Sequence, residues 1–273
     1  MTNNKPMQSS GSNKFRGLVE LMECPACGKE TLSFVEDKLL CKCGSAFQVK
    51  DGILDLMGGV DVEGNFSQAA MRFNPLIRIY DVIWRHMTFP FVTNIPLSKE
   101  VKILMGYQTL KPGYRLLDIA CGPGTYSRRF AHAVGESGRV VGADASMPML
   151  RQAVKSAKDQ NLENVIFLRS AAENLPFRRG VFDGANCTGA LHLFSDIGLV
   201  LGKIHRTLKP GGVFTCMTFR KSPIGPLNVV YKKLGVTLFD EAELKETLVK
   251  KGFTNYRSRA SRLMLLFAAD KAK

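Results

Sequence analysis

Four cysteines near the N-terminus have the type and spacing of metal ligands. Cys24 and Cys27 form a C-P-A-C pair, Cys41 and Cys43 form a C-K-C pair, and a glycine follows each pair. Thiolates on two tight turns can converge on one Zn²⁺ with tetrahedral geometry. A segment of about 35 residues is too short to build a self-sufficient hydrophobic core, so a bound metal would stabilise it. The spacing therefore predicts a structural zinc site within residues 21–57.

The second pair departs from the C-x-x-C spacing of zinc ribbons, because only one residue separates Cys41 from Cys43. Two alternatives to zinc therefore stay open: a ribbon that no longer binds metal, and a disulfide. A disulfide is disfavoured because the N-terminus lacks the apolar stretch of a secretory signal. The other cysteines lie in or beside apolar runs, and we expect small buried hydrophobic residues at Cys121, Cys187 and Cys216.

A second group of residues could bind a nucleoside. The strand expected at 115–119 leads into a turn with Gly122 and Gly124, where the backbone can approach a ligand closely. Asp144 follows Gly122 by 22 residues, at the end of the next expected strand, where a carboxylate accepts hydrogen bonds from a ribose diol. A dinucleotide fingerprint has a third glycine where Ser127 stands. The other candidate ligand is S-adenosylmethionine, which has a ribose but no phosphate.

Five segments carry a family resemblance: "LLDIACGPGTYS", "VVGADASMPMLRQA", "AENLPFRRGVFDGA", "ALHLFSD" and "IHRTLKPGGVF". In this order and spacing they resemble class I S-adenosylmethionine-dependent methyltransferases of the ubiquinone/menaquinone-biosynthesis-like type, over about residues 70–260. With the cysteine segment, the whole chain resembles methyltransferases that carry a zinc-ribbon-like N-terminus, a group that includes bacterial ribosomal-RNA guanine methyltransferases. The resemblance implies an α/β fold: a Rossmann-like, seven-stranded, mostly parallel sheet with helices on both faces, plus a small N-terminal zinc-ribbon-like β segment.

The resemblance also implies which residues bind S-adenosylmethionine at its methionine end. Ala120, Gly122 and Gly124 would line the methionine part, and Asp118 would favour its ammonium group. The family often has glycine where Ala120 stands. Taken alone, each glycine also fits a plain turn requirement.

At the nucleoside end, the resemblance implies that Asp144 binds both ribose hydroxyls and that Ala145 and Met149 flank the adenine. The family has an aspartate for the adenine amino group where this chain has Ala171, and Ala172 can still offer its backbone N–H. Losing one such hydrogen bond should weaken binding by about 1 kcal/mol. The alternative for Asp144 is the N-cap of the helix that follows.

Methyl transfer from a sulfonium has a neutral leaving group, so alignment and desolvation are the main tasks. A general base is needed only when the nucleophile arrives protonated. His192 lies after the expected strand "FDGANCT" and is the candidate base; alternatively, it is a polar residue at a strand-to-helix junction. The chain has no N-P-P-Y/F or D-P-P-Y motif, which argues against methylation of an adenine or glutamine amino group.

Two variable pieces are expected to cover the acceptor. Tyr80 and Trp84 are four residues apart and share a helix face, either as a lid whose aromatic face stabilises the sulfonium or as a plain packing face. The segment 219–238 is basic and suits an anionic substrate, RNA or a peripheral contact with a membrane surface.

The elements that must position these residues form four regions. We expect a disordered tail at 1–20, the zinc-ribbon-like segment at 21–57, a linker at 58–70 and a methyltransferase domain at 71–273, with a helical lid (72–110) and a basic insert (219–238). A helix is expected at 239–253 with Asp240 as N-cap, followed by a closing pair of strands.

Charge and hydropathy limit the partners. The 273 residues carry a formal net charge of +14, but residues 1–64 carry −2 and residues 220–273 carry +7. The excess of basic residues therefore lies in the C-terminal part of the chain and not in the cysteine segment. No apolar run approaches the ~20 residues that span a bilayer. We expect a cytoplasmic protein, with import into an organelle left open.

Three functions follow for the whole chain. The first is a methyltransferase acting on a small, apolar or aromatic acceptor. The second is an RNA base methyltransferase that uses the ribbon for recognition, and the third is a non-catalytic module that binds S-adenosylmethionine or a protein partner.

Overall fold

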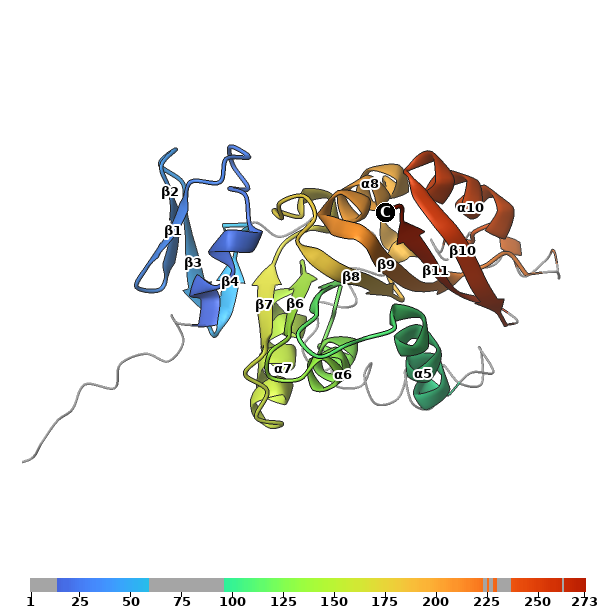
Figure 1. The fold of residues 1–273 in the computed structure, drawn as a ribbon, viewed down its shortest axis with the longest axis horizontal. Helices are drawn as coiled ribbons and strands as arrows, with labels where there is room; N and C mark the ends of the chain where they lie inside the picture. Colours follow the sequence, from blue (N-terminus) through green and yellow to red (C-terminus); the bar gives the residue numbers. More distant parts are fainter. Residues whose placement is uncertain (1–13, 59–95, 223–224, 226–227, 230–236, 262) are drawn as a thin grey trace, which may run out of the picture.

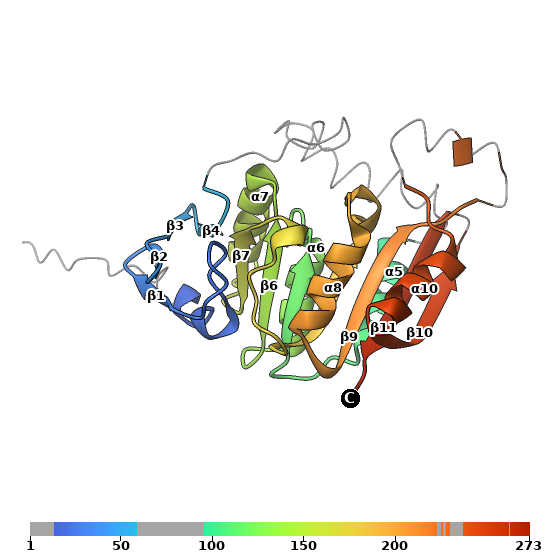
Figure 2. The ribbon, with the colours of Figure 1, turned by 90° about the horizontal axis from the view of Figure 1, so that it is seen from above.

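The structure is a computed structural model that describes residues 14–58, 96–222, 225, 228–229, 237–261 and 263–273. Its described strands form one mixed sheet of eleven, in the order β1-β2-β3-β4-β7-β6-β5-β8-β9-β11-β10. The ribbon strands lie at one end of this sheet and β10 lies at the other (Figure 2).

Seven of these strands form the Rossmann-like sheet that the sequence predicts. Strands β7, β6, β5, β8 and β9 are mutually parallel. Strand β11 runs antiparallel to β9, and β10 runs antiparallel to β11, so β11 alone opposes the direction of the other six. This arrangement confirms the predicted fold class. The bounds are β5 Arg115–Ile119, β6 Arg139–Asp144, β7 Val165–Arg169, β8 Phe182–Thr188, β9 Leu208–Phe219, β10 Phe253–Ala260 and β11 Met264–Lys271.

Helices cover both faces of the sheet, and each face has its own apolar core (Figure 1). On one face lie α5 (Leu97–Gln108), α6 (Thr125–Val134) and α7 (Met147–Lys158). On the other lie α8 (Ile197–Thr207) and α10 (Glu241–Lys250). Asp240 accepts hydrogen bonds from the N–H groups of the first turn of α10, as the sequence predicts for an N-cap.

The N-terminal ribbon joins the methyltransferase sheet directly. It comprises η1 (Val19–Leu21) and the antiparallel strands β1 (Leu32–Val35), β2 (Lys38–Cys41), β3 (Ala46–Lys50) and β4 (Ile53–Asp55). Strand β4 then pairs in parallel with β7. The sequence predicts a separate small segment, whereas the structure makes the ribbon an extension of the same sheet.

Burial explains why β4 pairs with β7. Ile53 and Leu54 are both fully buried, and they contribute to the cores on opposite faces of the sheet. A strand that is apolar on both faces is typical of a parallel sheet covered by helices on both sides. The three residues of β4 therefore belong to the Rossmann-like core as much as to the ribbon.

The tail is shorter than the sequence predicts. Phe15 is 2% exposed and Leu18 is fully buried, and both belong to the core that also contains Phe177 and Leu175. No local pattern marks these apolar side chains as buried, because their packing partners lie about 160 residues away in the sequence. The prediction of disorder up to residue 20 is therefore wrong from residue 14 onward.

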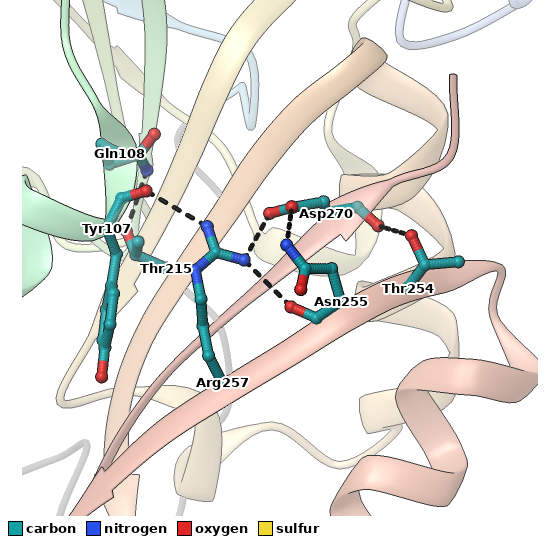
Figure 3. A network of polar contacts seen from close by, with 7 residues as sticks. All are labelled: Tyr107, Gln108, Thr215, Thr254, Asn255, Arg257 and Asp270. Carbon is teal, nitrogen blue, oxygen red and sulfur yellow. Dashed lines mark hydrogen bonds and ion pairs between the residues drawn. The ribbon is translucent and has the colours of Figure 1, made fainter.

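Helix α5 is fixed to the sheet, although the sequence places it in the lid. The Nε2 of Gln108 donates to the Ala185 carbonyl at 2.7 Å and to Thr215 Oγ1 at 2.9 Å. Arg257 on β10 donates to the Tyr107 carbonyl at 3.2 Å, near the C-terminal end of the helix (Figure 3). Cations and donors at this position stabilise the last carbonyls of a helix. The part of the predicted lid that is described thus forms a core layer.

Several predicted features lie outside the described residues: Tyr80 and Trp84, the lid from 72 to 95, and the linker beyond residue 58. In the basic insert, the described Ser222 and Asn228 exchange two hydrogen bonds of 2.7 and 2.9 Å. Within the described ranges, no helix is long and apolar enough to cross a membrane.

Candidate active site

The carboxyl ends of the parallel strands meet at one edge of the sheet, where ligands bind in open α/β folds. The turn after β5 carries residues 120–124, and the turn after β7 carries 170–172. Asp144 ends β6, and residues 145–149 run from the following turn into α7. The short helix η4 (Leu191–Leu193) follows β8 and carries His192. The structure thus brings the predicted cofactor residues and the candidate base to the same edge.

The turn after β5 has three residues with positive φ: Ala120 (50°), Gly122 (53°) and Gly124 (72°). A methyl group added at Gly122 would meet no heavy atom within 4 Å. At Gly124 it would lie 3.0 Å from Ala153 Cβ and 3.1 Å from the Phe167 ring. Gly122 therefore borders open space that a ligand can fill, whereas Gly124 is required for close packing against α7 and β7.

Asp118 is a buried carboxylate with defined donors. Ser127 Oγ donates to Asp118 Oδ2 at 2.6 Å, and Asn186 Nδ2 donates to Asp118 Oδ1 at 2.7 Å. The three residues come from β5, α6 and β8, and each is at most 2% exposed. These bonds fix the turn after β5 to the start of α6. A contact between Asp118 and the ammonium group of the methionine part stays a prediction.

Asp144 ends β6 with its carboxylate half-buried at the sheet edge. Gly122 N–H donates to Oδ2 and Ser146 N–H donates to Oδ1, each at 2.8 Å. Burial raises the pKa of Asp144 above its ordinary value, while these N–H donors act in the opposite direction. Each carboxylate oxygen has a second lone pair, so both can also accept from ribose hydroxyls. The N-cap position of α7 belongs to Ser146, not to Asp144.

The adenine side of the site is formed by small residues. Ala145 and Ala171 are half-buried, whereas Met149 is only 3% exposed. Ala172 begins the short helix η3 (Ala172–Asn174), so its N–H has no intrahelical acceptor and can donate to a ligand. Contacts of adenine with these residues, and with Met149 in particular, stay predictions.

His192 lies in a nearly closed apolar setting. Its ring packs edge-on against the Phe219 ring, with centroids 4.7 Å apart, and the residue is 8% exposed. Burial lowers the pKa of His192 to about 4, so the imidazole is neutral at pH 7. Within the part of the chain that the structure describes, Nδ1 is buried without a hydrogen-bond partner. Buried polar atoms normally have a partner, so a ligand group that reached this nitrogen would satisfy it.

The four N-terminal cysteines converge. Sγ of Cys24 lies 3.8 Å from Sγ of Cys43, and Sγ of Cys27 lies 3.7 Å from Sγ of Cys41. All four sulfur atoms lie within 4.8 Å of one another. Four thiolates about 2.3 Å from one Zn²⁺ would be about 3.8 Å apart at the corners of a tetrahedron. The C-x-C pair therefore reaches the same point as the C-x-x-C pair, and none of these thiols forms a disulfide.

The other three cysteines behave differently. Cys121, Cys187 and Cys216 are buried and unpaired by disulfides, as the sequence predicts. Burial raises the pKa of Cys121 and of Cys216 well above the ordinary value, which keeps both thiols protonated. Two further contributors to the site were not singled out from the sequence: Asn186, which binds Asp118, and Arg169, which donates to the Ala145 carbonyl. Both lie on strands, and no local motif marks them.

Comparisons with known proteins show which enzymes this chain resembles. An uncharacterized chloroplastic methyltransferase of Arabidopsis thaliana is 28% identical over 247 residues, covering 84% of this chain and 69% of that protein. A ubiquinone/menaquinone biosynthesis C-methyltransferase of Coxiella burnetii is 35% identical over 45% of this chain and 49% of that protein. A demethylmenaquinone methyltransferase of Lactococcus lactis is 38% identical over 38% of this chain and 42% of its own length. The chain thus aligns with about half the length of these two bacterial relatives.

A solved structure supports the fold. Phosphoethanolamine N-methyltransferase 2 of Haemonchus contortus, with S-adenosylhomocysteine bound, has a TM-score of 0.65 at 18% identity, over 78% of this chain and 61% of that one. The family model described as the ubiE/COQ5 methyltransferase family matches residues 69–255, which is more than half of the chain. With the glycine turn, Asp144 and the strand order in place, the chain belongs to the ubiE/COQ5 family of S-adenosylmethionine-dependent methyltransferases.

Proposed function

We propose that this enzyme methylates a ring carbon of a small hydroxylated aromatic acceptor, of the kind that precedes a quinone. The single observation that carries the proposal is the surroundings of His192, where one buried nitrogen without a partner in the described structure lies against the Phe219 ring. An apolar aromatic wall with one polar atom suits a phenolic ring. The printed names of the Coxiella burnetii and Lactococcus lactis relatives point to the same class of acceptor.

S-adenosylmethionine, when bound, supplies a methyl group on a positively charged sulfur that leaves as a neutral thioether. The residues of this chain would hold it at the carboxyl edge of the sheet. Asp144 would accept hydrogen bonds from the ribose hydroxyls, and the methionine part would lie in the open space beside Gly122. Asp144 is already oriented by two backbone N–H groups, so little ordering is needed on binding.

His192 would act on the acceptor. Its neutral imidazole would accept a hydrogen bond from the acceptor's hydroxyl group at Nδ1, which makes the neighbouring ring carbon more nucleophilic. Burial disfavours a free imidazolium, so the proton would stay shared in this hydrogen bond while the methyl group is transferred. After that carbon bonds the methyl group, its hydrogen leaves as a proton to solvent, and the hydroxylated aromatic ring is restored. Phe219 restricts the ring plane and excludes water from the nitrogen.

The cysteine cluster supports a second part of the proposal, that Cys24, Cys27, Cys41 and Cys43 bind one structural Zn²⁺. The sulfur separations fit the edges of a tetrahedral zinc–thiolate site. The cluster lies in the ribbon, away from the sheet edge that carries Asp144, so this metal would stabilise structure and take no part in the reaction.

The test uses the full-length chain and S-adenosylmethionine labelled in its methyl group. Titration calorimetry should show binding by the wild type, with Asp144→Asn at least about tenfold weaker because a charge-assisted hydrogen bond is lost. Label should then pass to hydroxylated aromatic compounds, with His192→Asn strongly impaired and the exposed-histidine variant His132→Asn unaffected.

Three results would overturn the proposal. Absence of binding in the wild type would support the non-catalytic alternative. Label found in RNA and not in small aromatic compounds would support the RNA alternative. Equal rates for His192→Asn and wild type on an aromatic acceptor would remove His192 from the reaction.

A further inference from the structure

Arg169 is a buried cation that lies between the ribbon and the turn after β6. Its Nη1 is 3.3 Å from Asp55 Oδ2 on β4, and its Nε donates to the Ala145 carbonyl at 3.0 Å. The whole residue is 3% exposed. In the sheet, Arg169 is in register with Asp55 on one side and with Asp144 on the other. One side chain therefore touches both the last ribbon strand and the residue that follows Asp144.

The ribbon also holds the chain that follows β7. Leu56 N–H donates to the Arg169 carbonyl at 3.1 Å, and Glu23 N–H donates to the Pro176 carbonyl at 2.8 Å. Residues 169–176 are thus held at both ends by the ribbon. This segment carries residues 171–172, which the family resemblance predicts to lie beside the adenine.

The buried Arg169–Asp55 ion pair must do more than stabilise the fold. A buried arginine is expensive without a partner, and a buried ion pair is often no more stable than apolar residues of the same size. Arginine differs from apolar residues, and from lysine, because its planar guanidinium donates in several fixed directions at once. Here those directions reach a carboxylate on β4 and a carbonyl on the turn after β6. Asp55 is itself oriented by the Met57 N–H, which donates to its Oδ1 at 2.9 Å.

We propose that Arg169 is a positioning residue through which the ribbon sets the affinity of the enzyme for the nucleoside part of S-adenosylmethionine. Asp55 holds the guanidinium, the guanidinium holds the Ala145 carbonyl, and the turn that begins at Asp144 is thereby fixed in the geometry that binds ribose and adenine. The inference rests on the proposed placement of the cofactor. It gives the N-terminal ribbon a role in cofactor binding as well as in structure.

The test measures dissociation constants by calorimetry for two ligands, S-adenosylmethionine and 5′-methylthioadenosine. The second has the adenine and ribose but lacks the amino acid. Asp55→Asn and Arg169→Lys should each weaken both ligands by the same factor, about tenfold, because only the nucleoside contacts are disturbed. Asp55→Glu keeps the charge and should restore most of the affinity. All measurements are made well below the melting temperature of each variant, so that a loss of stability alone leaves the dissociation constants unchanged.

Glu23→Gln is the matched control. Glu23 also pairs with an arginine of the methyltransferase domain, Arg206, and its side chain is 19% exposed against 15% for Asp55. The Glu23–Arg206 pair does not reach the turn after β6, so affinity for both ligands should stay at the wild-type value.

Two outcomes overturn the inference while the proposed function stands. In the first, Asp55→Asn and Arg169→Lys bind both ligands like the wild type. In the second, Glu23→Gln weakens binding as much as Asp55→Asn, which makes the effect a general consequence of loosening the ribbon. If the wild type itself binds neither ligand, the proposed cofactor site is wrong. This result differs from the first two outcomes, in which the wild type binds and only the role of Arg169 is refuted.

Discussion

Ser127 donates a hydrogen bond of 2.6 Å to Asp118, and both side chains are almost completely buried beneath the glycine turn. A dinucleotide-binding sequence would have glycine at position 127, where close packing of helix and strand leaves no room for a side chain. Here the side chain is used: it supplies a donor to a carboxylate at the end of β5. Asn186 supplies the second donor, so both oxygens of the buried carboxyl group accept a hydrogen bond.

Replacing Ser127 by alanine should therefore destabilise the fold. Asp118 would lose the short hydrogen bond from Ser127, and such a buried bond contributes about 1 kcal/mol. Urea unfolding should show a fall of that size in the free energy of unfolding. The exposed Ser33→Ala on β1 is the control and should change stability by less than about 0.5 kcal/mol. Equal stability for Ser127→Ala and wild type would mean that the bond contributes nothing.

Ala120→Gly should be tolerated and should not lower stability. Ala120 has φ = 50°, a left-handed conformation that costs an alanine about 1 kcal/mol and a glycine almost nothing. Glycine has more freedom in the unfolded chain, which offsets most of this gain. The net change in unfolding free energy should lie between about zero and +1 kcal/mol.

The helical residue Ala133 on α6 provides the comparison for Ala120. Ala133→Gly should lose about 1 kcal/mol, because glycine is unfavourable inside a helix. Thermal unfolding of the two variants, side by side, checks the difference in sign. If Ala120→Gly loses as much stability as Ala133→Gly, the left-handed conformation of Ala120 carries no strain.

Acid should destabilise the protein through His192. Burial lowers its pKa to about 4, while an unfolded histidine has a pKa of about 6.5. Between these values the unfolded chain binds a proton that the folded chain does not, so the unfolding free energy falls as the pH falls. Titration of His192 leaves the free energy of unfolding unchanged above about pH 6.5. It lowers that free energy by about 3 kcal/mol as the pH falls to 4.

The pH dependence of His192→Asn checks this prediction. Its unfolding free energy, measured in urea at several pH values from 7 to 4.5, should fall less steeply than that of the wild type. His132→Asn, which replaces an exposed histidine, should keep the wild-type slope. Parallel curves for His192→Asn and wild type would show that His192 titrates normally in the folded protein.

Metal analysis should find one zinc ion per chain in protein purified without chelators. Cys43→Ser should lose most of that zinc, because it removes one ligand of the proposed tetrahedral site. Cys187→Ala, which changes a buried cysteine outside the cluster, should keep the full zinc content. A wild-type protein without zinc, or a Cys43→Ser variant with undiminished zinc, would refute the proposed site.

Removal of zinc should also lower the melting temperature by several degrees. The ribbon has little core of its own, and its last strand covers the edge of β7, so loss of the metal loosens a part of the main sheet. Differential scanning calorimetry with and without a strong chelator measures this change. The Cys43→Ser variant should show no further drop when the chelator is added.

Much of the cofactor site is local in the sequence, and that is why it could be predicted. Gly122 and Gly124 lie on one turn, and Asp144 is one strand away, so their meeting follows from the order of strand, turn and helix. The same reasoning applies to the four cysteines, because the hairpin of β1 and β2 brings the two pairs together. The C-x-C spacing left the second pair in doubt, and only the folded hairpin shows that Cys43 reaches the other three.

Other relationships depend on contacts between distant segments. Strand β4 could have remained in a free ribbon, and it joins β7 because Ile53 and Leu54 are covered by helices and core residues from both faces of the main sheet. The same pairing places Asp55 beside Arg169, more than a hundred residues away, and Arg169 beside the Ala145 carbonyl. The burial of His192, which lowers the pKa of the imidazole, likewise brings η4 against Phe219 at the end of β9.

The sequence by itself determined the chemistry that is available: two thiol pairs, a glycine turn with an acid 22 residues on, and the order of strands and helices. Residue types and short spacings carry that information because tight turns and strand ends bring near neighbours together. The tertiary structure alone decided that the ribbon and the methyltransferase domain share one sheet, and that a buried arginine connects them. Strand pairing and burial are settled by partners far along the chain, and no local pattern records which partner a strand will meet.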